Sequence, residues 1–146
     1  FTKVARAASA SSVYGGTNHA LWNAANAVDG IIECGKDSSA ILAHTDYQKN
    51  PWLKVSLEKT NNVDRVLIYN RQDCCGERLH NVRVSVTDNG RNISCGFYPG
   101  PAANGDRILF LCEKETRGNE VTISILSKDG QLDFLNVCEV EIYSRT

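Results

Sequence analysis

The chain lacks methionine, any long apolar segment and any marked excess of charge. No apolar run approaches the roughly 18 residues that a membrane-spanning helix needs, so we expect no membrane insertion. The 16 basic and 17 acidic residues leave a net charge of −1, without the basic surface typical of nucleic-acid binding, so we expect no nucleic-acid partner. The length of 146 residues suits one domain over residues 1–146. Because the chain begins at Phe1, we expect a processed or excised fragment.

The cysteines lack the C-x-x-C spacing of zinc sites, and only 3 histidines accompany them. Their even number, 6, instead indicates disulfides and therefore a secreted, extracellular protein. The sequon that begins at Asn92 fits a secreted glycoprotein. The residues alone leave the pairing open. The adjacent Cys74 and Cys75 suit a vicinal bridge that forces a tight turn, and a redox switch is the alternative reading of this pair.

Apolar residues follow the period of β-strands along most of the chain. Alternation with polar residues predicts half-buried strands at 52–57, 82–86, 121–126 and 138–143. Continuous apolar runs predict buried strands at 63–69 and 108–112, and one short helix is predicted near 20–28. Clusters of Gly, Asn and Asp separate the strands, as in the turn at 88–90. The pattern predicts an all-β fold, an antiparallel β-sandwich.

The segment 71–78 concentrates the chemistry of the chain. Arg71 and Arg78 flank the two adjacent cysteines, and their mutual repulsion requires carboxylates such as Asp73 and Glu77 nearby. Arginine presents planar, forked N–H donors, which suit carboxylates, phosphates or vicinal sugar hydroxyls. The alternative is an ordinary solvated charged turn. An acid or base role for Asp73 or Glu77 is disfavoured, because neighbouring arginines lower carboxyl pKa values.

Three residues of this region share a spacing with His44, in the order His-x26-Arg-x-Asp-x4-Arg. In this pattern His44, Arg71, Asp73 and Arg78 resemble the sugar-binding signature of the F-type lectin (fucolectin) family. The vicinal cysteines and the segments 26–30, 50–52 and 138–141 resemble the same family in register, over roughly residues 5–143. The resemblance implies a discoidin-like jelly roll that binds terminal α-L-fucose on glycans and is not an enzyme.

The resemblance also implies a role for each site residue. His44, Arg71 and Arg78 would donate hydrogen bonds to the sugar, with the axial 4-hydroxyl as the discriminating contact. Asp73 would hold an arginine in place, and bridged Cys74 and Cys75 would offer a flat apolar surface to the C–H face of the sugar. Three disulfides are implied: Cys74–Cys75, Cys95–Cys112 and Cys34–Cys138.

Two features of the family pattern are missing from this sequence. The aromatic wall beside the fucose methyl group has no evident counterpart, and Tyr14, Ile41 and Leu42 are its candidate replacements. A bridge from Cys34 requires a different loop path before His44, because the family often places its cysteine at the position of Leu42. Among the remaining residues, His19 is a candidate neighbour of the sugar site, and His80 is expected to be solvated. The tryptophans Trp22 and Trp52 are expected in the core.

A structural Ca²⁺ site is the second feature that the resemblance implies. Calcium binds six to eight oxygens, many of them backbone carbonyls. The implied ligands are the side chains of Asp29 and Glu139, backbone oxygens of Asn26, Ile31 and Cys138, and a further oxygen from residues 38–41, for which Ser39 is the candidate.

The expected partners are fucosylated glycans on glycoproteins or cell surfaces, met in cell recognition or innate immunity. A homo-oligomer or a tandem array would give such a weak, shallow site avidity. Two alternatives remain: a discoidin-like adhesion module that binds protein or membrane, and an accessory carbohydrate-binding domain of a larger secreted protein.

Overall fold

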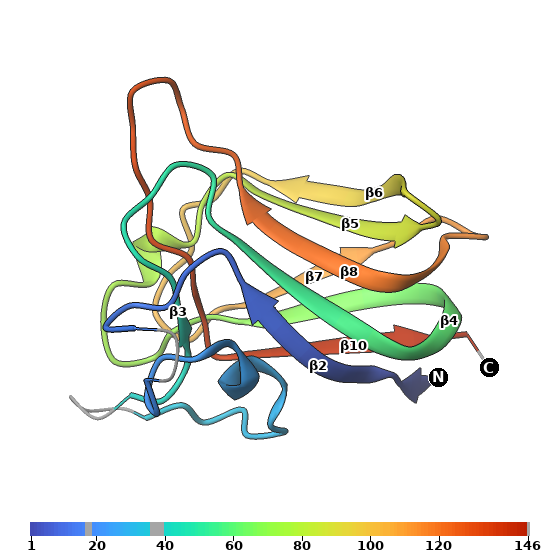
Figure 1. The fold of residues 1–146 in the computed structure, drawn as a ribbon, viewed down its shortest axis with the longest axis horizontal. Coiled ribbons are helices and arrows are strands. Elements are labelled where there is room, and N and C mark those ends of the chain that lie inside the picture. The colour runs from blue at the N-terminus through green and yellow to red at the C-terminus, as the bar shows by residue number, and fades with distance from the viewer. Residues whose placement is uncertain (17–18, 36–39, 146) are drawn as a thin grey trace.

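The computed structural model describes residues 1–16, 19–35 and 40–145, and these form a sandwich of two antiparallel layers (Figure 1). One layer has the strand order β1 (Thr2–Lys3), β10 (Glu139–Ser144), the second half of β4 (Trp52–Tyr69) and β7 (Arg107–Leu111). The other has the order β2 (Ala5–Ala10), the first half of β4, β8 (Arg117–Ile125), β5 (Val82–Asp88) and β6 (Arg91–Tyr98). The predicted all-β antiparallel sandwich is confirmed.

Strand β4 belongs to both layers. Its first half pairs with β8 and its second half with β10, and its register against β8 shifts between Ser56 and Asn61. Residues 58–60 are exposed at this point, where the strand crosses from one layer to the other. The separate strands predicted at 52–57 and 63–69 are therefore one strand of 18 residues. Strands β2 and β6 were not predicted.

The core lies between the layers and follows the alternation that the sequence shows. From one layer Val55, Val84 and Ile123 point inward, and Val66 and Ile142 face them from the other; all five side chains are fully buried. Apolar burial of this kind contributes about 25 cal/mol per Å² and is the main favourable term in folding. Packing of the core in this register also determines which residues extend into the loops at the ends of the sandwich.

The three disulfides pair as the resemblance implied: Cys34–Cys138, Cys74–Cys75 and Cys95–Cys112. Cys95 on β6 and Cys112 after β7 lie in different layers, so their bridge joins the layers. The Cys34–Cys138 bridge ties the loop after the first short helix to the start of β10. All six cysteines of the chain are used.

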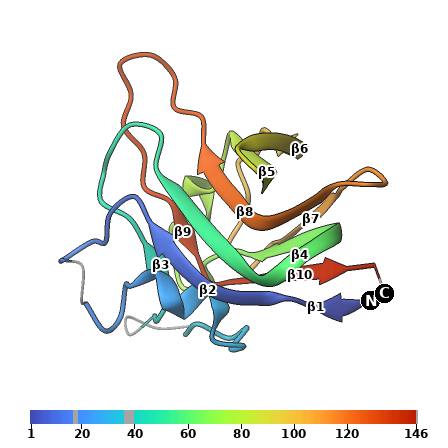
Figure 2. The ribbon, with the colours of Figure 1, turned by 45° about the vertical axis from the view of Figure 1, so that its right-hand side comes forward.

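The remaining short elements gather at one end of the sandwich, opposite the two chain ends, as both views show (Figures 1 and 2). They are the 3₁₀ helices η1 (Ala24–Val28) and η2 (Gly76–Arg78) and the strand pair β3 (Ala43–His44) and β9 (Asn136–Val137). The helix predicted at 20–28 is thus present but shorter. Asn23 caps it by accepting a hydrogen bond from the backbone N–H of Ala25. No helix in the described residues is long and apolar enough to cross a membrane.

Candidate functional site

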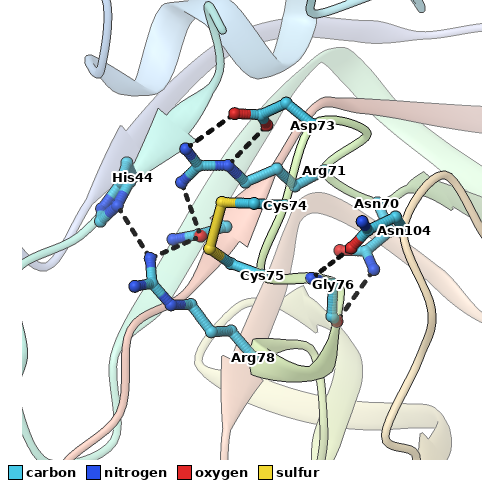
Figure 3. The surroundings of a disulfide bond; sticks show 10 residues. His44, Asn70, Arg71, Asp73, Cys74, Cys75, Gly76, Arg78 and Asn104 are labelled. Atoms are coloured by element: carbon cyan, nitrogen blue, oxygen red, sulfur yellow. Dashed lines mark hydrogen bonds and ion pairs between the residues drawn. A yellow bond between two sulfur atoms is a disulfide. The ribbon is translucent and has the colours of Figure 1, made fainter. Parts of the chain in front are cut away.

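The loop that follows β4 carries the residues singled out in the sequence, and hydrogen bonds on its inner side fix its shape (Figure 3). The Asn70 side chain donates to the carbonyl oxygens of Gly76, at 3.0 Å, and Ala103, at 2.9 Å. The Gly76 N–H donates to Asn104 Oδ1 at 2.8 Å. A Cβ at position 76 would lie 2.4 Å from the Asn104 backbone nitrogen, so only glycine fits. The loop is therefore a rigid platform rather than a solvated turn.

The two arginines of this loop share one acceptor. Arg71 holds Asp73 through both carboxylate oxygens, at 2.8 and 3.2 Å, as expected for a residue that positions the guanidinium. The remaining Nη1 of Arg71 donates to Asn136 Oδ1 at 3.2 Å, and Nη1 of Arg78 donates to the same oxygen at 3.3 Å. Asn136 is buried and reaches the site because β3 and β9 pair His44 with Asn136. Sequence reasoning missed Asn136.

The close approach of the guanidiniums leaves a strongly polarised site. Burial first, and then the charge of Arg71, lower the pKa of Arg78. The hydrogen bonds from Arg71 lower the pKa of Asp73, so this carboxylate stays ionised and does not serve as a proton donor. Glu77 is exposed and contributes only a long-range charge to Arg78. The site thus keeps N–H donors free for a ligand and offers no acid–base pair.

His44 completes the cluster, but as an acceptor. Its Nδ1 faces the Thr45 carbonyl oxygen at 2.8 Å, so Nδ1 carries the proton, and Nε2 turns its lone pair toward Arg78 Nη1 at 3.4 Å. Burial, helped by both arginine charges, lowers the pKa of His44 to about 4, so the ring is neutral at physiological pH. Because the backbone carbonyl takes its N–H, the His44 ring is placed to accept a hydrogen bond through Nε2, whereas the resemblance implies a donor.

The Cys74–Cys75 bridge lies between Arg71 and Arg78 (Figure 3). Cys75 adopts a left-handed backbone conformation, with φ 63°, which turns the chain into η2 and directs Arg78 back toward His44. Both cysteines are half-buried, so the sulfur atoms form an apolar patch within a ring of polar groups.

Aromatic rings close the site on two sides. On one side Trp22 lies edge-on to His44, at a centroid distance of 5.3 Å, with Arg71 5.6 Å above its ring. On the other, Tyr14 and Phe134 lie 4.8 and 5.2 Å from the His44 ring. Arg78 lies 4.5 Å over Phe134, a cation–π contact that fixes the guanidinium. Phe134 was missed in the sequence; together with Tyr14 it lines this side of the polar cluster with aromatic rings.

Three other expectations change. Leu42 is completely buried and cannot form a wall. Ile41 lines a different hollow, shared with Asp29 and Ile31. Both tryptophans are only half-buried: Trp22 packs against a small core cluster and also contacts the ring of His44, and Lys54 covers the ring of Trp52 at 4.6 Å.

Of the two remaining histidines, only His80 differs from its expected role. His19 stacks on Trp22 at 5.9 Å and so borders the site through this ring. His80 is not merely solvated. Its Nδ1 contacts the Arg78 carbonyl oxygen at 3.0 Å and its Nε2 contacts Asp133 Oδ1 at 3.0 Å. His80 therefore links the backbone of one sugar-site arginine to the loop that carries the aromatic wall.

The residues expected to bind calcium meet beside the start of β10. Glu139 is buried; its Oε2 accepts from the Gly30 N–H at 2.9 Å, while its Oε1 has no hydrogen-bond partner among the residues that the structure describes. Burial raises the pKa of Glu139 to about 8, and the adjacent Asp29 carboxylate adds to the rise, against the effect of the Gly30 N–H. Two acids side by side, one with an unpaired buried oxygen, form an environment that a divalent cation would stabilise.

This environment fits calcium without completing its ligand set. The Ile31 N–H donates to Asp29 Oδ1 at 2.9 Å, which holds the loop around the carboxylates, and Cys138 is anchored by its bridge. The Asn26 side chain donates from Nδ2 to the Ala20 carbonyl oxygen at 3.1 Å, which fixes the orientation of its amide next to the carboxylates. Ser39 lies outside the described residues. Within residues 1–16, 19–35 and 40–145 no cluster of three or more His, Cys, Asp or Glu suits a metal, so a calcium ion here would need backbone oxygens as well.

The fold and the site together define a class of protein. A rigid, donor-rich surface at the loop end of a two-layer sandwich is a binding module, and the family model described as NedA-like, galactose-binding domain matches residues 26–126. The chain is 33% identical to Fucolectin-4 of Anguilla japonica over 131 residues, which cover 87% of this chain and 70% of that protein. The chain belongs to the fucolectin family.

Solved structures agree with this assignment. The f-lectin (fucolectin) from the serum of striped bass, Morone saxatilis, superposes with a TM-score of 0.80 at 28% identity; the match covers 99% of this chain and 50% of that one. A mutant of the lectin binding domain of Lectinolysin complexed with Lewis b superposes with a TM-score of 0.78 at 25% identity, over 95% of this chain and 92% of that domain. The chain thus spans half the length of the striped bass protein and nearly all of the Lectinolysin domain. These matches confirm the discoidin-like jelly roll.

Proposed function

We propose that this domain is a secreted, calcium-containing lectin that binds terminal α-L-fucose on glycans and performs no catalysis. The observation that carries the proposal is the convergence of Arg71, Arg78 and His44 around Asn136, with an apolar disulfide between the two guanidiniums. The fucolectin relatives and the Lewis b complex of Lectinolysin support fucose as the sugar.

The polar groups match a single axial hydroxyl. A hydroxyl group donates one hydrogen bond and accepts two. The lone pair on His44 Nε2 accepts the hydroxyl proton, and Arg71 and Arg78 donate to its oxygen. Hydrogen bonds to charged groups contribute roughly 1.5–3 kcal/mol each before desolvation. An equatorial 4-hydroxyl would leave the plane of the sugar ring in a different direction and lose this set of partners, so the axial 4-hydroxyl is the discriminating contact.

The apolar groups match the other surfaces of fucose. With its 4-hydroxyl among the polar groups, the sugar lays its C–H face on the Cys74–Cys75 sulfur atoms. Its methyl group, which replaces a hydroxymethyl group, packs against the wall of Tyr14 and Phe134. The site holds one sugar and is shallow, so its affinity for the monosaccharide should lie in the millimolar to micromolar range, roughly 4–8 kcal/mol.

Calcium has a structural role in this proposal. Asp29 and Glu139 supply side-chain oxygens, Asn26, Ile31 and Cys138 supply backbone oxygens, and Ser39 is the candidate for a further ligand. The bound ion would neutralise the two adjacent carboxylates and join the loop before His44 to β10. The unpaired Oε1 of Glu139 supports this assignment.

The partners are fucosylated glycans on glycoproteins or cell surfaces, in cell recognition or innate immunity. Both chain ends lie away from the sugar site, so linked copies in a tandem array or a homo-oligomer could bind one surface together (Figure 2). The disulfides support an extracellular location, and the sequon residue Asn92 is exposed on β6, which supports a glycoprotein.

A glycan array, read with and without EDTA, tests the proposal. We expect binding confined to glycans with terminal fucose, and competition by free L-fucose but not by D-mannose. EDTA should weaken binding only as far as it destabilises the fold. An array with no preference for fucose would refute the sugar assignment.

One observation favours the adhesion alternative. Leu126 and Leu132 are 43% and 45% exposed on the loop that follows β8, as a protein- or membrane-binding tip requires. That alternative leaves the polar cluster of His44 and the arginines without a role. Binding to glycan-free vesicles or proteins, without any glycan signal, would decide for it. An accessory carbohydrate-binding domain of a larger secreted protein would bind the same glycans on the array. It would differ only in the length of the full protein to which it belongs.

A further inference from the structure

An exposed aromatic ring continues the wall of the sugar site outward. Tyr47 lies 4.9 Å from Phe134 between ring centroids, and Phe134 lies 5.2 Å from His44. Phe134 is half-buried, whereas Tyr47 is 58% exposed. The rings of Phe134 and Tyr47, the aromatic shelf, therefore lead from the polar cluster toward open solvent.

Phe134 marks the boundary of the fucose position. Arg78 lies over its ring at 4.5 Å, and Tyr14 meets it edge-on at 5.9 Å. Tyr47 makes its ring contact with Phe134. It therefore lies one ring further from the polar cluster than Phe134 does.

The backbone beneath the shelf is fixed. Gln48, which follows Tyr47, and Asp133, which precedes Phe134, exchange backbone hydrogen bonds in both directions at 3.0 and 2.8 Å. Asp133 is further held by His80 and by the Ser127 hydroxyl at 2.7 Å. The shelf is thus prepared before any ligand arrives, so ordering it should cost little binding energy.

The surroundings of Tyr47 select for a neutral ligand with an apolar face. Asp46 and Lys49 flank it on the same segment, are both exposed, and carry opposite charges. A tyrosine ring offers an apolar face and one hydroxyl at its edge, which suits a pyranose with C–H groups on one face and hydroxyls at its rim.

We propose that the aromatic shelf of Phe134 and Tyr47 is a second subsite, which stacks the neutral pyranose linked to the terminal fucose. The galactose or N-acetylglucosamine ring of a fucosylated glycan belongs to this class. This inference rests on the proposed function, because the fucose held by the polar cluster places the second ring. Covering about 50 Å² of aromatic surface at about 25 cal/mol per Å² corresponds to about a tenfold gain in affinity.

Calorimetry with three ligands tests the second subsite. The ligands are methyl α-L-fucoside, a fucose α1→2-linked to galactose and a fucose α1→3-linked to N-acetylglucosamine. The proteins are the unmodified domain, Tyr47→Ala, Tyr47→Phe and Phe97→Ala. Phe97 is the matched control, since it is 52% exposed on β6, where it pairs with Arg83 of β5.

At least one disaccharide should bind the unmodified domain about tenfold more tightly than the monosaccharide. Tyr47→Ala should remove that gain and leave monosaccharide affinity within about twofold, while Tyr47→Phe keeps most of the gain and Phe97→Ala changes nothing.

Three results would overturn the inference: no gain for either disaccharide, a gain that survives Tyr47→Ala, or an equal loss for all three ligands in Tyr47→Ala. If methyl α-L-fucoside and both disaccharides fail to bind the unmodified domain, the fucose site itself is refuted, and the second subsite with it. Binding of the monosaccharide without any gain refutes the second subsite alone.

Discussion

Replacing Arg78 by alanine removes one of the two guanidiniums of the proposed sugar site. Its guanidinium reaches Asn136 at 3.3 Å and His44 at 3.4 Å, and it is only half-buried, so its remaining donors are open to a ligand. Loss of one charged hydrogen-bond donor costs roughly 2–3 kcal/mol. That corresponds to a loss of affinity of about 30-fold to 150-fold, at about 1.4 kcal/mol for each factor of ten. A site at the weak end of the range of roughly 4–8 kcal/mol should then bind fucose too weakly to measure.

The fold should survive this change. Arg78→Ala removes the stacking on Phe134 but also removes the repulsion from Arg71, which helps to lower the pKa of Arg78. Asn136 keeps Arg71 as a donor at 3.2 Å. We therefore expect a net change in the free energy of unfolding of about 1 kcal/mol or less, and a melting temperature within about 4 °C of the unmodified domain.

Calorimetry with methyl α-L-fucoside, together with thermal unfolding, measures both effects. Arg78→Lys should also fail to bind, because a point charge cannot replace the planar fork. Arg83→Ala is the matched control: Arg83 is exposed on β5, and its removal should leave affinity unchanged. If Arg78→Ala binds fucose within about threefold of the unmodified domain, a contribution of less than about 0.7 kcal/mol would refute the role assigned to this guanidinium.

Three further predictions follow from the other groups. Fucose affinity should stay constant as pH falls through 6.5, the ordinary pKa of histidine, and should drop only near pH 4, where His44 takes up a proton. The contribution of neutral His44 to the free energy of unfolding is likewise present above pH 6.5 and lost as pH falls toward about 4. Titration calorimetry measures the affinity, and thermal melts measure the stability. Without calcium, the raised pKa of Glu139 stabilises the fold at low pH, and this stability is lost as pH rises from 4.5 to about 8. The rise in melting temperature on adding calcium should therefore grow over that pH range and vanish in Glu139→Gln or Asp29→Ala. An unchanged calcium effect in these variants would exclude the site. Peptide mapping of the unreduced protein should find Cys74 linked to Cys75, and mild reduction should weaken fucose binding before the domain unfolds, because the bridges that close larger loops carry more of the stability; a link from either residue to another cysteine would contradict the apolar sugar surface.

The sequence predicted those parts of the fold in which apolar periodicity is strong. Strands β5, β8 and β10 follow the alternation seen in the residues. Strand β2 was missed because Ala5–Ala10 is made of small residues with little intrinsic strand preference. The length of β4 was missed because the polar residues 58–62 resemble a turn, although they form a corner where the strand changes layer.

In the candidate site, too, the residues with a recognisable sequence pattern were predicted and the others were missed. His44, Arg71 and Arg78 carried a recognisable spacing, and the structure brings them together. Asn136 and Phe134 carried no local signal: Asn136 lies 65 positions after Arg71 and reaches it only through the pairing of β3 with β9. The direction of the His44 hydrogen bonds was also beyond the sequence, since it depends on where the carbonyl oxygen of Thr45 points.

The central claim is that Arg71, Arg78 and His44 together read the axial 4-hydroxyl of a terminal fucose. Calorimetry with L-fucose and its 3-deoxy and 4-deoxy forms tests it most directly. The account predicts that 3-deoxyfucose binds much like fucose, whereas 4-deoxyfucose loses at least about 30-fold in affinity, because two charged donors and one acceptor lose their shared partner. Equal affinity for fucose and 4-deoxyfucose would contradict it.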